Sequence, residues 1–168
     1  MAKEKIDFVV WKEQIANLTE DDFYLAITVN GPTEFYFMNF TAGVTIDIVF
    51  KNLSGMRLIV EHGSFVIPRL WIDNSILPNY PLVLAYSTIE IDEVIKITRE
   101  ATLETFYRAM QMLQRPMPGR YDITARASFT TVHYIGQRTW SPRPPYMRDF
   151  NIISNPITLT FYHPYLDL

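Results

Sequence analysis

Apolar and polar residues alternate along much of the chain, which is the pattern of strands with one buried face. The alternation is clearest in two segments, which put these residues on one face each: Val44, Ile46, Ile48 and Phe50; Tyr121, Ile123, Ala125 and Ala127. We predict further strands at 6–11, 23–29, 34–40, 56–61, 64–73, 82–86, 89–97 and 157–162, while 130–135 either extends the preceding strand or pairs back.

Two local signals refine this pattern. The four residues Asn52-Leu53-Ser54-Gly55 separate two alternating segments, which predicts a β-hairpin between 43–51 and 56–61. A different period follows at 102–114, where apolar residues recur every three or four positions. This spacing predicts one amphipathic helix with Thr102 as its N-cap, ended by Pro116.

The composition supports a packed β domain. Hydrophobic residues make up 48% of the 168 residues and charged residues 20%, so disorder is not expected. The 10 Tyr and 11 Phe favour pleated, half-buried surfaces. We predict a single all-β domain over 1–168. It is an antiparallel β-sandwich, immunoglobulin-like or jelly-roll-like, with one short helix and a C-terminal extension at about 136–168.

Residues with catalytic chemistry do not form a recognisable motif. The absence of cysteine excludes disulfides and thiolate sites, and His62, His133 and His163 lack metal-binding spacing. Ser54 and Ser64 lack the glycine pair of a nucleophile elbow, and the 6 glycines form no phosphate-binding loop. We therefore predict no catalytic residue, no cofactor and no metal, and a protein that is not an enzyme.

Net charge and apolar segment length limit the partners. A net charge of −3 gives no general attraction to nucleic acid, and apolar segments are too short to span a membrane. The charged start at 3–7 has no apolar segment after it, so we expect no signal peptide and a location in the cytoplasm or in a virion.

Two C-terminal segments carry side chains typical of protein contacts. The proline-rich segment 138–148 mixes arginine with aromatic residues, and the tail 163–168 is apolar. Either segment can instead pack on its own sandwich, with Trp140 buried in the first case. We predict a protein partner, and self-association in particular, through these residues: Arg138, Trp140, Arg143, Tyr146, Arg148, Tyr165, Leu166 and Leu168.

Glycan attachment is a further possibility raised by the sequence. Three Asn-x-Ser/Thr sequons occur, at Asn17, Asn39 and Asn52, and all lie at predicted turns or strand ends. The competing interpretation is that Asn, Ser and Thr gather in turns for backbone hydrogen bonding.

The segment Pro118-Gly119-Arg120-Tyr121 resembles the Pro-Gly-x-Tyr turn that opens a late strand in immunoglobulin-like β-sandwiches. With the inner strand at 44–52, it is similar in particular to the intracellular proteinase-inhibitor domain type. The resemblance covers 44–129 and implies a β-sandwich with, in that domain type, inhibitor activity. The helix at 102–114 and the C-terminal extension depart from the pattern, so no functional residue is transferred.

These observations together favour a structural or assembly protein, such as a subunit of a virion, filament or surface layer. The alternative is a binding module, either a protease inhibitor with an exposed loop at 76–81 or 136–148, or a carbohydrate-binding domain using Trp71 or Trp140. A hydrolase that uses carboxylates between residues 90 and 104 is a third alternative.

Overall fold

The computed structural model describes residues 7–36, 43–63, 68–73, 75–76, 85–114, 119–137, 144 and 146–162. The elements within these ranges are α1 (Phe8–Ala16), η1 (Glu20–Asp22), β1 (Phe23–Asn30), β2 (Glu34–Tyr36), β3 (Val44–Asn52), β4 (Leu58–His62), β5 (Pro68–Ile72), β6 (Ser75–Ile76), β7 (Ala85–Ile89), β8 (Val94–Ala101), α2 (Leu103–Leu113), β9 (Gly119–Val132), β10 (Asp149–Ile153) and β11 (Ile157–Tyr162).

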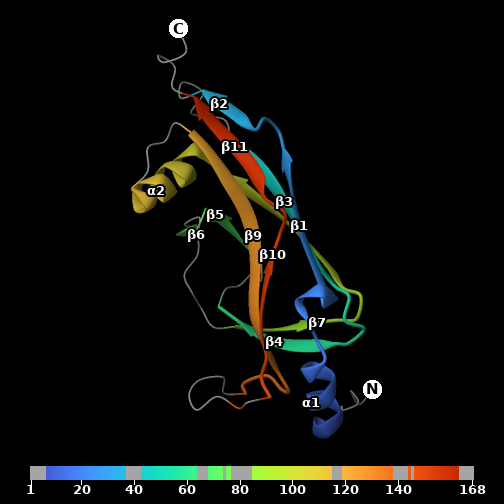
Figure 1. Cartoon of the computed structure of the whole chain (residues 1–168). Helices are drawn as coiled ribbons and strands as arrows, with labels where there is room; N and C mark the ends of the chain where they lie inside the picture. The colour runs from blue at the N-terminus through green and yellow to red at the C-terminus, as the bar shows by residue number, and fades with distance from the viewer. Residues whose placement is uncertain are drawn as a thin grey trace.

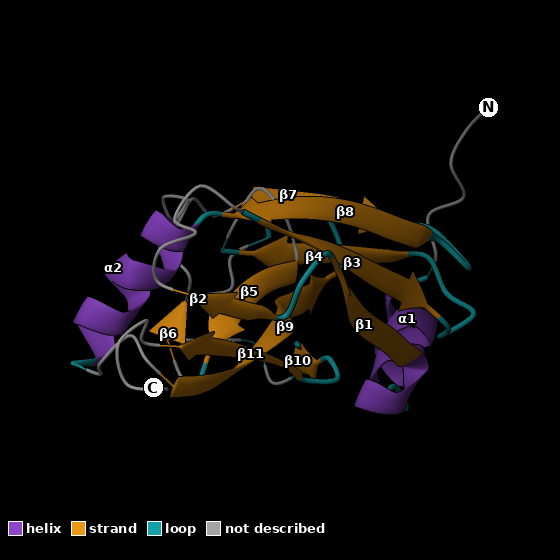
Figure 2. Cartoon of the chain, turned by 90° about the horizontal axis from the view of Figure 1, so that it is seen from above, coloured by secondary structure: helices purple, strands orange, loops and turns teal. Residues whose placement is uncertain are grey.

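The described strands form two sheets that pack face to face, with α1 and α2 at opposite ends (Figure 2). The first sheet has the order β1-β3-β8 and is antiparallel throughout. The second follows the order β2-β11-β9-β4-β7, with β10 and β5 also on β9 and β6 on β5; its β2–β11 pair is parallel. The predicted all-β sandwich is therefore confirmed.

The core lies between the two sheets, and the predicted alternation places it. Every second residue of β3 is buried, as is every second residue of β9 from Tyr121 to Phe129. Aromatic rings join the layers: Phe23 of β1 lies 5.3 Å from Phe129 of β9 and 5.2 Å from Phe150 of β10, measured between ring centroids. Such edge-to-face pairs add to the stabilisation that burial alone provides.

The long strand β9 organises the second sheet (Figure 1). It pairs with β11, β5, β10 and β4 along its length. The predicted C-terminal extension is therefore not an extension over 149–162, because β10 and β11 are strands of the sandwich. The reason is their own alternation, which buries Phe150 and Ile152 on β10 and Leu159 and Phe161 on β11.

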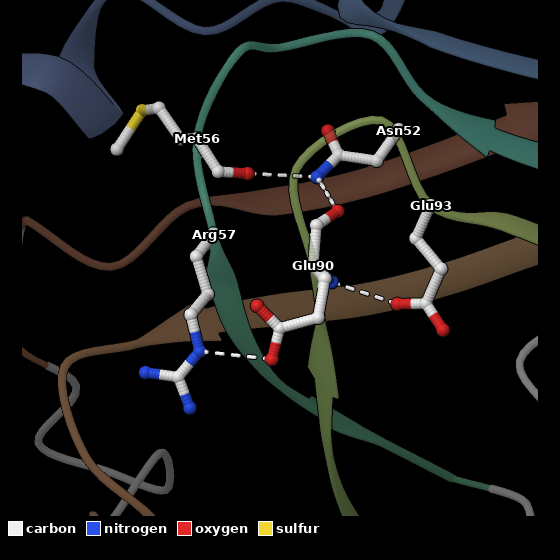
Figure 3. A network of polar contacts seen from close by, with 5 residues as sticks. All are labelled: Asn52, Met56, Arg57, Glu90 and Glu93. Carbon is white, nitrogen blue, oxygen red and sulfur yellow. Dashed lines mark hydrogen bonds and ion pairs between the residues drawn. The ribbon is translucent and has the colours of Figure 1, made fainter. Parts of the chain in front are cut away.

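The predicted hairpin between β3 and β4 is wrong. β3 belongs to the first sheet and β4 to the second, so residues 53–57 cross from one layer to the other. The fully buried Asn52 side chain shapes this crossing, because its Nδ2 donates to the carbonyl oxygens of Met56 at 2.7 Å and Glu90 at 2.9 Å (Figure 3). Apolar alternation on both strands suits two facing layers as well as it suits one hairpin.

A second crossing lies beside the first and breaks the strand predicted at 89–97. β7 ends at Ile89 in the second sheet, and β8 begins at Val94 in the first. Asp92 adopts a left-handed backbone with φ 56°, and the Glu93 carboxylate accepts a hydrogen bond from the Glu90 amide at 2.7 Å (Figure 3). Asn52 therefore ties two crossings together where the sequence predicted none.

The N-terminal segment is a helix, so the strand predicted at 6–11 is wrong. Asp7 caps α1 by accepting hydrogen bonds from the amides of Val9 and Val10. Trp11 and Ile15 form its buried side, whereas Glu13 between them is exposed; a strand would put all three residues on one face. This helix was missed because the apolar segment is short enough to fit either period.

The other predicted elements overlap the structure within the described residues, although β7 shares only residues 85 and 86 with the strand predicted at 82–86 and β10 was not predicted. α2 is the predicted helix, and its N-cap Thr102 accepts from the Thr105 amide at 3.3 Å. Strands occur at 23–30, 68–72, 85–89 and 157–162, 34–36 is the described part of the strand predicted at 34–40, and β9 extends to Val132. Neither described helix is both long and apolar enough to cross a bilayer.

Candidate functional site

A side chain caps the outer edge of the three-stranded sheet at one position, Ile27 of β1. The amide of Ile27 on β1 donates to Oδ1 of Asn155 at 3.1 Å, and Nδ2 of Asn155 donates to the Ile27 carbonyl at 3.2 Å. The carboxamide thus satisfies a donor and an acceptor that a neighbouring strand would otherwise use. Natural sheets protect their edges in such ways, because an open edge pairs with other chains.

Two backbone hydrogen bonds at the end of the first sheet show which residues of β1 and β8 direct their N–H and C=O groups toward β3 and which direct them outward. The Leu53 amide donates to the Asp22 carbonyl at 2.8 Å, and the Asn52 amide donates to the Glu93 carbonyl at 3.1 Å. In an antiparallel ladder, hydrogen-bonded and non-bonded pairs alternate along each strand. Ile27 therefore directs its polar groups away from β3, in agreement with its bonds to Asn155.

The same alternation defines the outer edge of β8. Ile95, Ile97, Arg99 and Ala101 are the positions that bond to β3 across the observed register. The positions between them direct their backbone N–H and C=O groups outward: Val94, Lys96, Thr98 and Glu100. No described strand pairs with this edge. β8 thus carries eight residues of ladder with one open side.

Side chains on β8 make this edge different from the other ends of the sheets. Lys96, Thr98 and Glu100 are exposed; Val94 at the start of the strand is 45% exposed, and Ile91 in the crossing before it is 55% exposed. β7 and β2 end the second sheet, but they have only five and three residues and are shorter templates. β8 is therefore the longest open edge among the described strands.

The Asp47 carboxylate on β3 links β8 to the first sheet on the solvent-exposed face of that sheet. Thr98 donates from its hydroxyl to Oδ1 of Asp47 on β3 at 2.6 Å, and Nδ2 of Asn30 on β1 donates to Oδ2 of the same carboxylate. These hydrogen bonds, that of Thr98 first, lower the pKa of Asp47 below its usual value of 3.8. The carboxylate thus links all three strands of the first sheet.

A second exposed surface lies at the α1 end of the sandwich. Val9 and Val10 on the helix are 56% and 47% exposed, and Tyr134 and Ile135 in the turn after β9 are 57% and 65% exposed. The Phe8 ring brings the helix to this turn, because its centroid lies 5.2 Å from that of His133. Clustered apolar side chains of this kind are typical of contact surfaces.

A cavity of about 360 Å³ opens between η1 and strands β4, β9 and β10. Glu20, Glu61 and Asp149 are among its lining residues, and the Thr130 hydroxyl donates to Asp149 at 2.5 Å. Across the described part of the chain, no group of three or more His, Asp or Glu residues is placed to hold a metal ion. The cavity is open to solvent, and its lining offers carboxylate, hydroxyl and amide groups to a ligand.

Two predicted contact residues have structural roles. The Tyr146 ring packs 5.0 Å from Phe8, and the Arg148 guanidinium donates to the carbonyls of Ile15 at 3.4 Å and Ala16 at 3.0 Å, at the end of α1. A cation at a helix C-terminus donates to the last carbonyls and interacts favourably with the helix dipole. The other predicted residues lie outside the described ranges: Arg138, Trp140, Arg143, Tyr165, Leu166 and Leu168.

The sequons differ in their surroundings. Asn17 is exposed at the C-cap of α1. Asn52 is fully buried, and its amide nitrogen already donates two hydrogen bonds, which leaves no room for a glycan in the folded chain. This matches the interpretation of that sequon as turn chemistry, and Asn39 lies outside the described residues.

The residues that distinguish the two edges were not singled out from the sequence. Asn155 precedes Pro156, a pair that marks a turn, but nothing in the pattern shows that its carboxamide reaches β1. Lys96 and Glu100 are polar residues at alternating positions of a strand, a pattern that is typical of any solvent-exposed strand face. Only the strand order shows that these residues lie on an open edge.

No family model and no curated protein matches this chain. Among solved structures, a protein from Archaeoglobus fulgidus is similar with a TM-score of 0.36 and 8% identity, over 82% of this chain and 94% of that one. A β-glucosidase from Listeria innocua, in complex with glucose, has a TM-score of 0.29 and 15% identity, over 79% of this chain and 16% of that one. The resemblance to immunoglobulin-like inhibitor domains stays a prediction.

Proposed function

We propose that the protein is a non-enzymatic assembly subunit, of the kind found in a virion, filament or surface layer, and that it self-associates through the edge of β8. The observation that carries this proposal is the contrast between the two ends of one sheet. Asn155 closes the β1 edge at Ile27, whereas no described residue closes β8. An open strand of eight residues is a template for addition of another strand.

Exposed apolar side chains support this proposal. Val94 begins the open edge and would be partly covered when a second strand adds to it, and Ile91 lies exposed just before the strand. The exposed residues of the α1 end offer a second contact surface for larger assemblies. Protein contacts at two separate places are what a subunit of an extended structure requires.

A binding module is the second candidate, favoured by the cavity whose lining includes the carboxylates of Glu20, Glu61 and Asp149. A carbohydrate would bind there through hydroxyl groups. Trp71 is less suited to this role than the sequence suggested, because the Arg126 guanidinium lies 4.4 Å from its ring centroid. Chemical-shift changes at the cavity residues on addition of mono- and disaccharides would support this candidate.

The experiment that tests self-association compares two substitutions at Thr98. Thr98→Pro removes the outward N–H of the edge and the hydroxyl that binds Asp47, while the backbone hydrogen bonds between β8 and β3 stay intact. Thr98→Val removes the same hydroxyl but keeps the N–H, so it is the matched control. Sedimentation velocity should show an oligomer for the wild type and Thr98→Val, and a folded monomer for Thr98→Pro. A monomeric wild type, or a Thr98→Pro variant that still assembles, would contradict the proposal.

A further inference from the structure

We infer that the partner of the β8 edge is a second copy of the same strand, antiparallel to the first and related to it by a two-fold axis at Thr98. This inference rests on the proposed function and adds the identity, direction and register of the contact. It follows from which backbone groups point outward and from where the charges of β8 lie.

Backbone geometry limits the possible registers. The outward N–H and C=O groups of β8 belong to its even-numbered positions, 94 to 100. A second β8 can bond to this edge only if its own even-numbered positions lie opposite them. In an antiparallel self-pair, each residue and its partner have numbers with a constant sum, so the sum must be even. One residue of β8 therefore lies directly opposite its own copy, and the two-fold axis passes midway between these two copies.

Charge selects among these registers. With the axis at Thr98, Lys96 of each copy lies opposite Glu100 of the other, which gives two opposite-charge pairs on the exposed face. An axis at residue 96 would put two lysines opposite each other, and an axis at residue 100 would put two glutamates there. Axes at 97 or 99 leave both charges without a charged residue opposite in β8. The Thr98 register alone pairs every charge of this face.

The remaining positions are compatible with this register. Thr98 faces its own copy, Ile95 faces Ala101, and Ile97 faces Arg99 through the apolar part of its side chain. The three-stranded sheets of two copies would become one continuous sheet with the order β1-β3-β8-β8-β3-β1. Because the contact is isologous, it closes on itself and uses up the open edge in both copies.

Charge-reversal variants test the register apart from self-association itself. Lys96→Glu leaves two glutamates on each edge, and Glu100→Lys leaves two lysines, so each variant alone should dissociate at least about tenfold more readily than the wild type. Mixed together, the two variants place opposite charges against each other at both pairs. The mixture should form a heterodimer with affinity near that of the wild type.

The outcomes separate the two proposals. Three results together would support the Thr98 register. Each single variant associates weakly, and the mixture of the two associates like the wild type. In about 1 M salt, which screens the charges, the single variants and the wild type associate with similar affinity. If Thr98→Pro abolishes association but the single variants associate like the wild type, the register is wrong while edge association stands. Failure of the mixture to recover, with both variants folded by circular dichroism, also overturns the register. A monomeric wild type overturns both proposals.

Discussion

Asn155 binds Ile27 through both backbone polar groups that Ile27 turns away from β3. The two residues are far apart in the sequence, and one side chain does locally what a neighbouring strand would do. β8, at the other end of the same sheet, has no such side chain among the described residues. Within the described ranges, a side chain thus caps β1 at Ile27, and no strand or side chain covers the opposite edge at β8.

Removing the Asn155 carboxamide should open the β1 edge. We expect Asn155→Ala to lower the free energy of unfolding by about 1 kcal/mol and to allow association through β1 in addition to β8. Asn155→Asp keeps an acceptor for the Ile27 amide, so its stability and its association should lie between those of the wild type and Asn155→Ala. Urea unfolding and sedimentation of the three proteins check this. An unchanged stability and association state for Asn155→Ala would contradict the role of Asn155.

Asn52 should be one of the polar residues on which stability depends most. Asn52→Ala leaves the carbonyls of Met56 and Glu90 without their donor in a buried crossing, so we expect a loss of about 2–3 kcal/mol in the free energy of unfolding. Ser54→Ala, which removes a neighbouring hydroxyl of the same turn, should cost less. Urea unfolding measures both, and equal effects would show that Asn52 does not hold the crossings together.

The sequence was a good guide to strands that are buried on one side. The alternation at 44–50 and 121–127 and the helical spacing at 103–113 depend on local period, and the structure confirms all three. The hairpin across 52–57 failed because the alternating face of a strand is the same whether its partner lies beside it or across the core. The sequence therefore predicted the layers better than the connections between them.

The candidate site was predictable only in part. Protein contact was expected from Tyr146 and Arg148 among others; both contact α1 within the chain, and their role in contacts with a partner stays a prediction. The β8 edge depends on the order of strands in the sheet, and pairings between distant segments leave no local signal. Lys96 and Glu100 become informative only once β8 is known to be an edge.

Arg148 should hold α1 to the sandwich. Arg148→Ala removes the donor to the Ile15 and Ala16 carbonyls and the contact with the Phe150 ring, whose centroid lies 5.4 Å from the guanidinium carbon. We expect the free energy of unfolding to fall by about 1–2 kcal/mol. Relative to the wild type, hydrogen exchange should speed up more in α1 than in β9. Arg148→Lys, which keeps the charge but not the planar group, should recover part of the effect. Unchanged exchange in α1 would contradict this role.

Acid should weaken the first sheet through Asp47. The pKa of its carboxyl is lower in the folded chain than its ordinary value of 3.8, so the folded state binds the proton less tightly than the unfolded state. Its contribution is present above pH 3.8 and is lost as the pH falls through the lower folded value. Urea midpoints from about pH 2.5 to 7 should show wild type and Asp47→Asn converging in acid. A constant difference would contradict this linkage.

Disulfide trapping of Thr98→Cys tests the symmetric β8 contact most directly. The chain has no cysteine of its own, so any covalent dimer reports the introduced thiol. Opposite residues of a hydrogen-bonded antiparallel pair have Cα atoms about 5.5 Å apart, within the range of about 4.4–6.8 Å that a disulfide bridges. In the same register, two copies of residue 96 lie roughly 13 Å apart along the strand, so Lys96→Cys is the matched control.

We expect mild oxidation to convert Thr98→Cys into a covalent dimer at protein concentrations where Lys96→Cys stays monomeric. Equal cross-linking of the two variants, or a Thr98→Cys protein that remains monomeric under oxidation, would contradict a two-fold contact at Thr98.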